Sequence, residues 1–206
     1  MKCDSLIFDL DGTLWDSTAQ VAESWNISLR RMAYDEPQLE AADIAGIMGM
    51  TENQIAEKIF RPYFGEDSER VCGICLREEV EYIAVHGGRM YDVVKGLLHA
   101  LAPRKLCIVS NCQAGYIEAF LSYSGLAGIF TDFECIGNSG LSKAENIRLV
   151  IDRNALKNPV YVGDTASDEK SASAAGCSFI HAAYGFGRAE APQYSISCPI
   201  ELLDYI

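Results

Sequence analysis

The chain has 206 residues, of which 49% are hydrophobic, and its 29 acidic and 17 basic residues give a formal net charge of −12. This length suits one domain, or one domain with a modest insertion, and the hydrophobic content is sufficient for a full core. Nucleic acids and anionic membranes bind clustered Lys and Arg, so the charge argues against both as partners.

Short apolar segments alternate with helical patterns along most of the chain. Strands are predicted over residues 5–10, 105–110, 159–163 and 178–182, with a weaker one near 132–136. Apolar stripes predict helices over residues 91–101 (with Val93 on the stripe), 115–125 and 143–153. The alternation predicts an α/β fold, with a Rossmann-like three-layer core and a mostly parallel sheet.

One segment breaks this alternation. Residues 17–88 contain helical patterns only, which is far more than a crossover connection requires. We therefore predict a small all-helical cap domain over residues 17–88, inserted into an α/β core of residues 1–16 and 89–206. Residues 16–20 and 86–88 are the expected hinges, because mobile lids over active sites are built in this way.

Polar residues follow the predicted strands where each strand ends. They are Asp9, Asp11, Ser110, Asn111, Asp164 and, four residues further on, Asp168. Ligands of open α/β sheets bind at the carboxyl ends of the strands, so we expect these side chains to share one crevice with Lys143, which begins a later helix. Taken singly, such residues are ordinary helix caps or surface groups.

The joint pattern predicts phosphoryl-transfer chemistry. Four carboxylates in one crevice repel one another unless a cation is present, and their hard oxygen ligands suit Mg²⁺. Mg²⁺, Lys143 and the Ser110 hydroxyl would neutralise a phosphoryl group and allow attack by a carboxylate such as Asp9. Gly12 permits a turn that places Asp11 beside Asp9, where it can protonate the leaving oxygen and later activate water.

Four short segments carry a resemblance to a known family. FDLDGTL, VSN, SK and GDTASD occur in that order, from residue 8 to residue 168. They resemble the four motifs of the haloacid dehalogenase superfamily, over nearly the whole chain. The helical insertion after the first motif is similar to that of the phosphoglycolate-phosphatase-like branch. The resemblance implies a Mg²⁺-dependent phosphatase that hydrolyses a small phosphorylated metabolite through an aspartyl-phosphate intermediate.

The resemblance also implies a role for each matched residue. Asp9 would be the nucleophile and Asp11 the general acid and base, and Ser110 and Lys143 complete the implied catalytic set. The phosphate would be held by Gly12, Thr13, Ser110, Asn111 and Lys143. The metal would be held by Asp9, Asp11 (through its backbone carbonyl), Asp164 and Asp168, the last through a metal-bound water unless it orients Lys143 instead.

Other functions use similar residues. A response-regulator receiver domain has an aspartate acceptor on a middle strand and no helical insertion. A non-catalytic protein of this fold is disfavoured because no expected catalytic group is missing. The main alternative is a sugar-phosphate mutase similar to β-phosphoglucomutase. Such enzymes usually have a His after the first motif and basic residues in the cap loop, where this chain has Glu52 and Asn53.

Substrate choice is expected to depend on the cap. Residues 46–53 are either a loop that contacts the substrate or a simple turn between helices, and their weakly polar composition favours a small organic phosphate. Arg61 fits a surface role better than a bond to a substrate carboxylate. Residues 183–188, after the last predicted strand, are expected to flank the site.

The cysteines and the chain start bear on the cellular compartment. Of the eight cysteines, Cys72 and Cys75 form a single CxxC pair, and with three His in the chain, packing is favoured over a zinc site. No apolar run approaches the roughly 20 residues of a membrane span. The first residues lack a signal-peptide pattern. We therefore expect a cytoplasmic protein with reduced cysteines.

Overall fold

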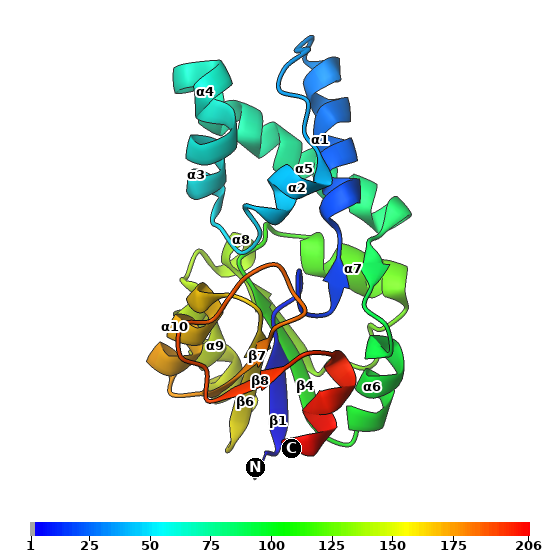
Figure 1. Ribbon diagram of the computed structural model, residues 1–206, viewed down its shortest axis with the longest axis vertical. Helices are drawn as coiled ribbons and strands as arrows, with labels where there is room; N and C mark the ends of the chain where they lie inside the picture. The colour runs from blue at the N-terminus through cyan, green and yellow to red at the C-terminus, as the bar shows by residue number, and fades with distance from the viewer. Residues whose placement is uncertain (1–2) are drawn as a thin grey trace.

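The computed structural model describes residues 3–206 and contains one large parallel sheet (Figure 1). Its strands are β1 (Ser5–Phe8), β4 (Lys105–Ser110), β5 (Asp132–Cys135), β6 (Pro159–Gly163), β7 (Ser178–Ala182) and β8 (Tyr194–Ile196). They pair in the order β5-β4-β1-β6-β7-β8. The strands that follow β1 in the sequence therefore lie first on one side of it (β4, β5) and then on the other (β6, β7, β8). Ligands of open α/β sheets bind where the strand order reverses in this way. The predicted fold class is confirmed.

Helices cover both faces of this sheet. α6 (Val94–Leu101) and α7 (Tyr116–Ser124) lie on one face, and α9 (Lys143–Arg153) and α10 (Ala166–Ala175) lie on the other (Figure 1). Successive side chains of β1 point to opposite faces, so Leu6 and Phe8 enter one buried cluster and Ile7 enters the other. Each such fully buried side chain contributes roughly 1.5–3 kcal/mol. The short α8 (Ile136–Ser139) and the 3₁₀-helix η3 (Pro199–Asp204) complete this part.

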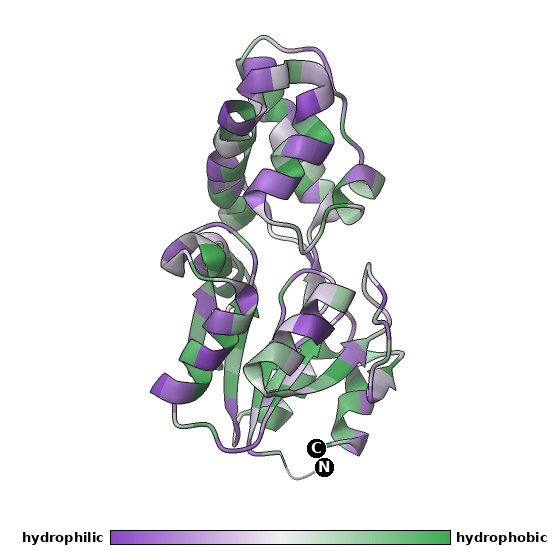
Figure 2. Cartoon of the chain, turned by 90° about the vertical axis from the view of Figure 1, so that its left-hand side faces the viewer, coloured by the Kyte–Doolittle hydropathy of each residue, from purple (hydrophilic) through white to green (hydrophobic). Residues whose placement is uncertain are grey.

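The chain between β1 and α6 is mainly helical. Its helices are α1 (Thr18–Arg31), α2 (Ala41–Ala45), α3 (Glu52–Ile55), the π-helix η1 (Ala56–Phe60), α4 (Arg61–Phe64), the 3₁₀-helix η2 (Gly65–Asp67) and α5 (Ser68–His86). They lie together beyond the carboxyl ends of the strands (Figure 1). Figure 2 shows mainly hydrophobic strands, whereas the helices combine hydrophobic and hydrophilic residues. The limits 17–88 of a separate cap domain stay a prediction. Across residues 3–206, no helix is both long and apolar enough to cross a membrane.

Two short strands connect the helical segment to the sheet-containing part. β2 (Trp15–Asp16) and β3 (Arg89–Met90) pair antiparallel where the chain enters and leaves this segment. The Asp16 carboxylate and the Arg89 guanidinium form an ion pair of 3.6 Å between them. Two-residue strands are too short to leave a periodic pattern, so the sequence did not predict them. Of the expected hinge at residues 16–20, all but the first two residues belong to α1.

Candidate active site

Strand register brings three predicted site residues to one edge of the sheet. Phe8 of β1 pairs with Ile108 of β4 and with Val162 of β6. The residues just beyond these pairs therefore reach the same edge. They include Asp9, Ser110 and Asp164, as the sequence predicted from their positions at strand ends.

Beyond Phe8 the chain turns sharply. The Asp9 N–H still donates to the Val162 carbonyl at 2.8 Å, and Gly12 then adopts a φ of +80°. A Cβ atom at position 12 would clash with the Asp164 carboxylate and crowd the ring of Phe186. Glycine therefore satisfies both the backbone conformation and the close approach of Asp164. The phosphate contacts predicted for Gly12 stay a prediction.

A buried group of carboxylates lies beside this turn. Asp9, Asp164 and Asp168 each bring one oxygen to within 4.8 Å of the others. Burial raises the pKa of Asp9 to about 7 and that of Asp164 to about 6, and neighbouring carboxylates add to both effects. The group thus holds negative charge at a free-energy cost that a bound cation would remove.

Lys143 lies between two of these carboxylates. Its Nζ atom is 2.6 Å from Asp168 Oδ1 and 3.1 Å from Asp9 Oδ1, and its side chain is 3% exposed. Burial lowers the pKa of Lys143, but the charges of Asp168 and Asp9 outweigh this effect and raise it above its usual value. The other oxygen of Asp168 accepts hydrogen bonds from the Thr165 N–H and hydroxyl, at 2.9 and 2.7 Å. These partners favour a role for Asp168 in orienting Lys143.

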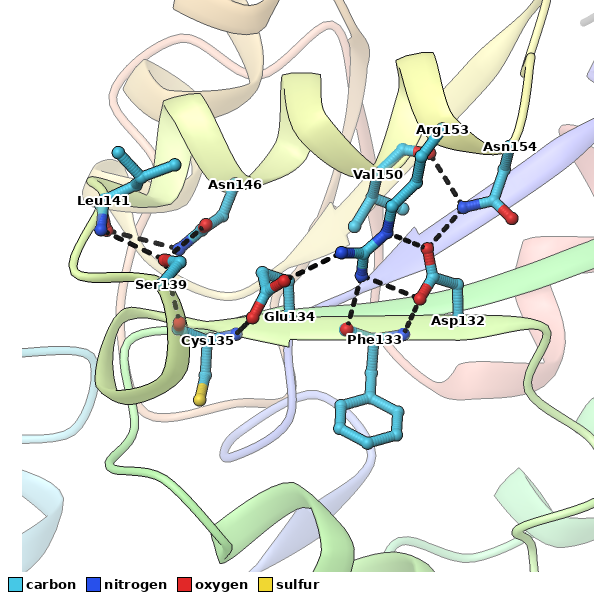
Figure 3. Close-up of polar contacts among 10 residues, drawn as sticks. All are labelled: Asp132, Phe133, Glu134, Cys135, Ser139, Leu141, Asn146, Val150, Arg153 and Asn154. Carbon is cyan, nitrogen blue, oxygen red and sulfur yellow. Dashed lines mark hydrogen bonds and ion pairs between the residues drawn. The ribbon is translucent and has the colours of Figure 1, made fainter.

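Polar contacts near both ends of α9, the helix that begins with Lys143, hold this helix against its neighbours (Figure 3). Near the start of the helix, the Ser139 hydroxyl donates to Asn146 Oδ1 at 2.7 Å. At its end, the Arg153 guanidinium binds Asp132 of β5 through two bonds of 2.5 and 2.7 Å. Figure 3 shows both sets on the same side of the helix, facing β5. The helix that carries Lys143 is therefore bonded to α8 near its start and to β5 at its end.

The loop after β7 closes the site on another side. The Phe186 and Gly187 N–H groups donate to Asp164 Oδ2 at 2.8 and 3.1 Å, and the Tyr184 hydroxyl donates to the carbonyl of the buried Thr13 at 2.9 Å. Asp164 Oδ1 is buried and has no hydrogen-bond partner among the described residues. A buried carboxylate oxygen without a partner is unfavourable. The carboxylate oxygens of Asp9, Asp164 and Asp168 therefore fit the Mg²⁺ ion that the sequence predicts.

Asp11 has partners of its own. The Ser17 hydroxyl donates to Asp11 Oδ1 at 2.6 Å, and the Tyr116 hydroxyl lies 3.1 Å from the same oxygen. Burial raises the pKa of Asp11 to about 6, against the effect of these hydrogen bonds. A carboxyl group that titrates near neutral pH suits proton transfer. Among residues 3–206, the carboxylates that lie close enough together to hold a metal ion do not include Asp11. The contact of the Asp11 backbone carbonyl with the metal stays a prediction.

A cavity of about 280 Å³ separates the site from the helical segment. Its residues on the sheet side include Asp9, Asp11, Ser110 and Asn111, and its residues on the helical side include 47–53. The Asn111 side-chain amide donates to the Gly49 carbonyl at 2.8 Å. The loop between α2 and α3 therefore faces the site, which favours a substrate contact over a simple turn.

Three polar side chains near the site were missed by the sequence analysis. Ser17 and Tyr116 contact Asp11, and Glu79 is a buried carboxyl group on the cavity wall. Only Glu79 left a usable signal: it continues the buried stripe of α5, four residues after Cys75 and four before Ile83. A carboxylate on an apolar stripe indicates a buried polar contact.

The remaining candidates have structural roles. Cys72 and Cys75 are completely buried in the hydrophobic core of the helical segment. Burial raises the pKa of the Cys75 thiol to about 12, and the group of metal-ligating side chains found among residues 3–206 contains neither cysteine. Arg61 is 59% exposed and pairs with Glu57 at 3.1 Å, as a surface residue does.

Replacing both Cys72 and Cys75 with Ala is expected to lower the melting temperature by a few degrees, because each loss of buried volume costs about 1 kcal/mol. The zinc-selective chelator TPEN should not change the melting temperature of the unmodified protein. Thermal denaturation with and without TPEN checks both points. A large decrease caused by TPEN in the unmodified protein alone would restore the zinc interpretation.

Comparisons with known proteins agree with this geometry. The model of a family described as haloacid dehalogenase-like hydrolase matches residues 6–182. A phosphoglycolate phosphatase from Aliivibrio fischeri is 26% identical over 206 residues, which cover 90% of this chain and 86% of the relative. A 5'-nucleotidase from Pseudomonas aeruginosa is 27% identical over 197 residues, which cover 91% of this chain and 86% of the relative.

Solved structures show the same fold. A haloacid dehalogenase-like hydrolase from Streptococcus pneumoniae matches with a TM-score of 0.83 and 21% sequence identity. The match covers 98% of this chain and 98% of the other chain. The similarity therefore extends over the sheet and the helical segment together.

Proposed function

We propose a specific reaction for this chain, which belongs to the haloacid dehalogenase-like hydrolase family and is a phosphatase. The proposed reaction is the Mg²⁺-dependent hydrolysis of a small phosphorylated metabolite through an aspartyl-phosphate intermediate. One observation carries the proposal. Asp9 lies beside Asp164, Asp168 and Lys143 in a buried group at the central strand, next to a cavity. A carboxylate attacks a phosphoryl group where positive charge is close by, and Lys143 together with a Mg²⁺ ion held by these carboxylates would supply it.

In the proposed reaction, the Asp9 carboxylate attacks phosphorus and forms the aspartyl phosphate while the P–O bond to the alcohol breaks. Asp11 gives its proton to the leaving oxygen. Asp11 then takes a proton from water, which attacks the phosphorus and releases inorganic phosphate and the free Asp9 carboxylate. Ser110, Asn111 and Lys143 bind the phosphoryl oxygens and keep them in line with the attacking group.

Asp9 and Asp164, with the Asp11 backbone carbonyl, would hold the Mg²⁺ ion. The ion, when bound, neutralises charge on the phosphoryl oxygens. Asp168 would keep Lys143 directed toward Asp9, through the 2.6 Å contact described above. Phe186 and Gly187 would hold Asp164 so that its second oxygen stays free for the ion.

No observation favours the sugar-phosphate mutase that the sequence left as the alternative. The loop over residues 46–53 faces the cavity and contains no basic side chain that could bind a second phosphate. Net hydrolysis is therefore the better-supported outcome of the same phosphoenzyme chemistry.

Hydrolysis of p-nitrophenyl phosphate tests the proposal. The purified protein should release p-nitrophenol when Mg²⁺ is present, and EDTA should stop the reaction until excess Mg²⁺ is added. The measurement is the absorbance of p-nitrophenolate under both conditions. An inactive protein in the presence of Mg²⁺ would contradict the proposed function.

A further inference from the structure

The cavity next to Asp9 has mostly apolar walls on its helical side. The side chains that form these walls include Val21, Trp25, Ile44, Met48, Met50 and Leu76. They come from α1, α2, α5 and the loop that precedes α3. In the proposed reaction the phosphate occupies the Asp9 end, so the alcohol part of the substrate must lie against these walls.

Every charged residue in the described lining of this cavity is acidic. Asp9 and Asp11 lie on the sheet side, and Glu52 and Glu79 lie on the helical side. Lys, Arg and His are absent from the described lining residues. Lys143 is not part of the lining, and its charge is already shared between Asp9 and Asp168. The cavity therefore offers no positive charge to the alcohol part of a substrate.

Glu79 strengthens this conclusion. It is 4% exposed, and it accepts hydrogen bonds from the Trp25 indole N–H at 2.5 Å and the Gln113 amide at 3.0 Å. The ion pairs found among the described residues do not include Glu79. Burial raises the pKa of Glu79 to about 8. Ionised, this carboxylate repels a second negative charge, and protonated it supplies no positive charge.

A substrate carboxylate or second phosphate would lose water on entering this space. The loss is unfavourable unless a cation or several donors replace the water. An uncharged alkyl or hydroxylated group meets no such penalty and gains from contact with the apolar walls. The volume of about 280 Å³ also lies just below the range of roughly 300–1,000 Å³ that is usual for ligand pockets.

We propose that the substrate is the monophosphate ester of a small, largely apolar alcohol without a second anionic group. The inference rests on the proposed function and narrows it. It separates this chain from the activity named for its relative from Aliivibrio fischeri, because phosphoglycolate carries a carboxylate. Bisphosphates are disfavoured for the same reason.

Two esters of nearly equal size test the proposal. They are 2-phosphoglycolate and 2-phosphoglycolamide, which differ in the charge of one group. We expect kcat/KM for the amide to exceed that for the acid by at least roughly tenfold, because the ionised carboxylate would lose its water in the cavity without gaining a cation. A kcat/KM for phosphoglycolate equal to or above that for the amide would overturn the substrate class.

A charge placed in the cavity provides the second test. Met50 is half-buried and lines the cavity, and Met50→Lys adds a positive charge on a side chain of similar length. The ratio of kcat/KM for the amide to that for the acid should fall at least roughly tenfold in Met50→Lys, and should stay within about twofold in the uncharged control Met50→Gln. Equal changes of the ratio in both variants would overturn the assignment to the missing cation.

The p-nitrophenyl phosphate assay separates the two levels of the inference. If the unmodified protein is inactive on this ester with Mg²⁺, the proposed function and the substrate class both fail. If it is active and also prefers phosphoglycolate to the amide, only the substrate class fails.

Discussion

Replacing Asp9 with Asn is expected to lower kcat for p-nitrophenyl phosphate by roughly 10⁴-fold or more, because an amide cannot form the phosphoenzyme. The side chain keeps its shape, and Lys143 keeps its 2.6 Å contact with Asp168. The variant should therefore fold. Steady-state kinetics at saturating Mg²⁺ measures the loss, and the melting temperature reports on folding.

The exposed Asp152 of α9 provides the matched control for this variant. Asp152→Asn makes the same chemical change on the helix that carries Lys143, and it should leave kcat within about twofold, as surface substitutions usually do. A folded Asp9→Asn protein that keeps more than about one percent of the activity would contradict the assignment of Asp9 as nucleophile.

Lys143→Met is expected to cause the second largest effect, on both stability and activity. It removes the cation from between two buried carboxylates, and breaking a buried ion pair on one side costs about 3–5 kcal/mol. For a chain of this length, that corresponds to a decrease of roughly 10 °C in melting temperature. Turnover should also be lost, because no side chain replaces the positive charge beside the phosphoryl group.

The decrease in stability should depend on pH. The pKa of Asp9 is about 7 with Lys143 present, and removal of the lysine raises it further. A carboxyl group whose pKa is higher in the folded than in the unfolded protein destabilises the fold when it is ionised, and protonation removes this effect. The melting temperature of Lys143→Met should therefore rise, relative to that of the unmodified protein, when the pH is lowered from 8 to 5.5. Lys170→Met, which breaks an exposed pair with Glu190, should show little change at either pH.

The sheet could be predicted from the sequence because its central strands are buried on both faces. β1, β4, β6 and β7 are mainly apolar runs. The helices α6, α7 and α9 have apolar stripes, whereas α10, between β6 and β7, has none and was not predicted. β8 has three residues and β2 and β3 have two each, which is too short for a pattern. Val93 was wrongly placed on the stripe of α6: it precedes the helix with a φ of +64° and is 53% exposed.

The candidate site was predictable for a related reason. Asp9, Ser110 and Asp164 lie at the ends of parallel strands, and strand register alone brings such ends together. Ser17 and Tyr116 reach Asp11 from the starts of two helices that the sequence could not orient relative to each other. The walls of the cavity also depend on how these helices pack against one another. The sequence therefore predicted the phosphoryl-transfer residues in more detail than the residues that select the substrate.

The pairing of β2 with β3 has a consequence for how this protein can evolve. Because the helical segment enters and leaves through adjacent, paired residues, its two ends are neighbours in space. Segments with neighbouring ends can be lengthened, shortened or exchanged without moving the chain on either side. The register of β1 with β4 and β6 does not pass through that segment. Selection can therefore alter the walls that contact the alcohol while the residues that act on phosphorus keep their positions, so that new substrates arise on an unchanged reaction centre.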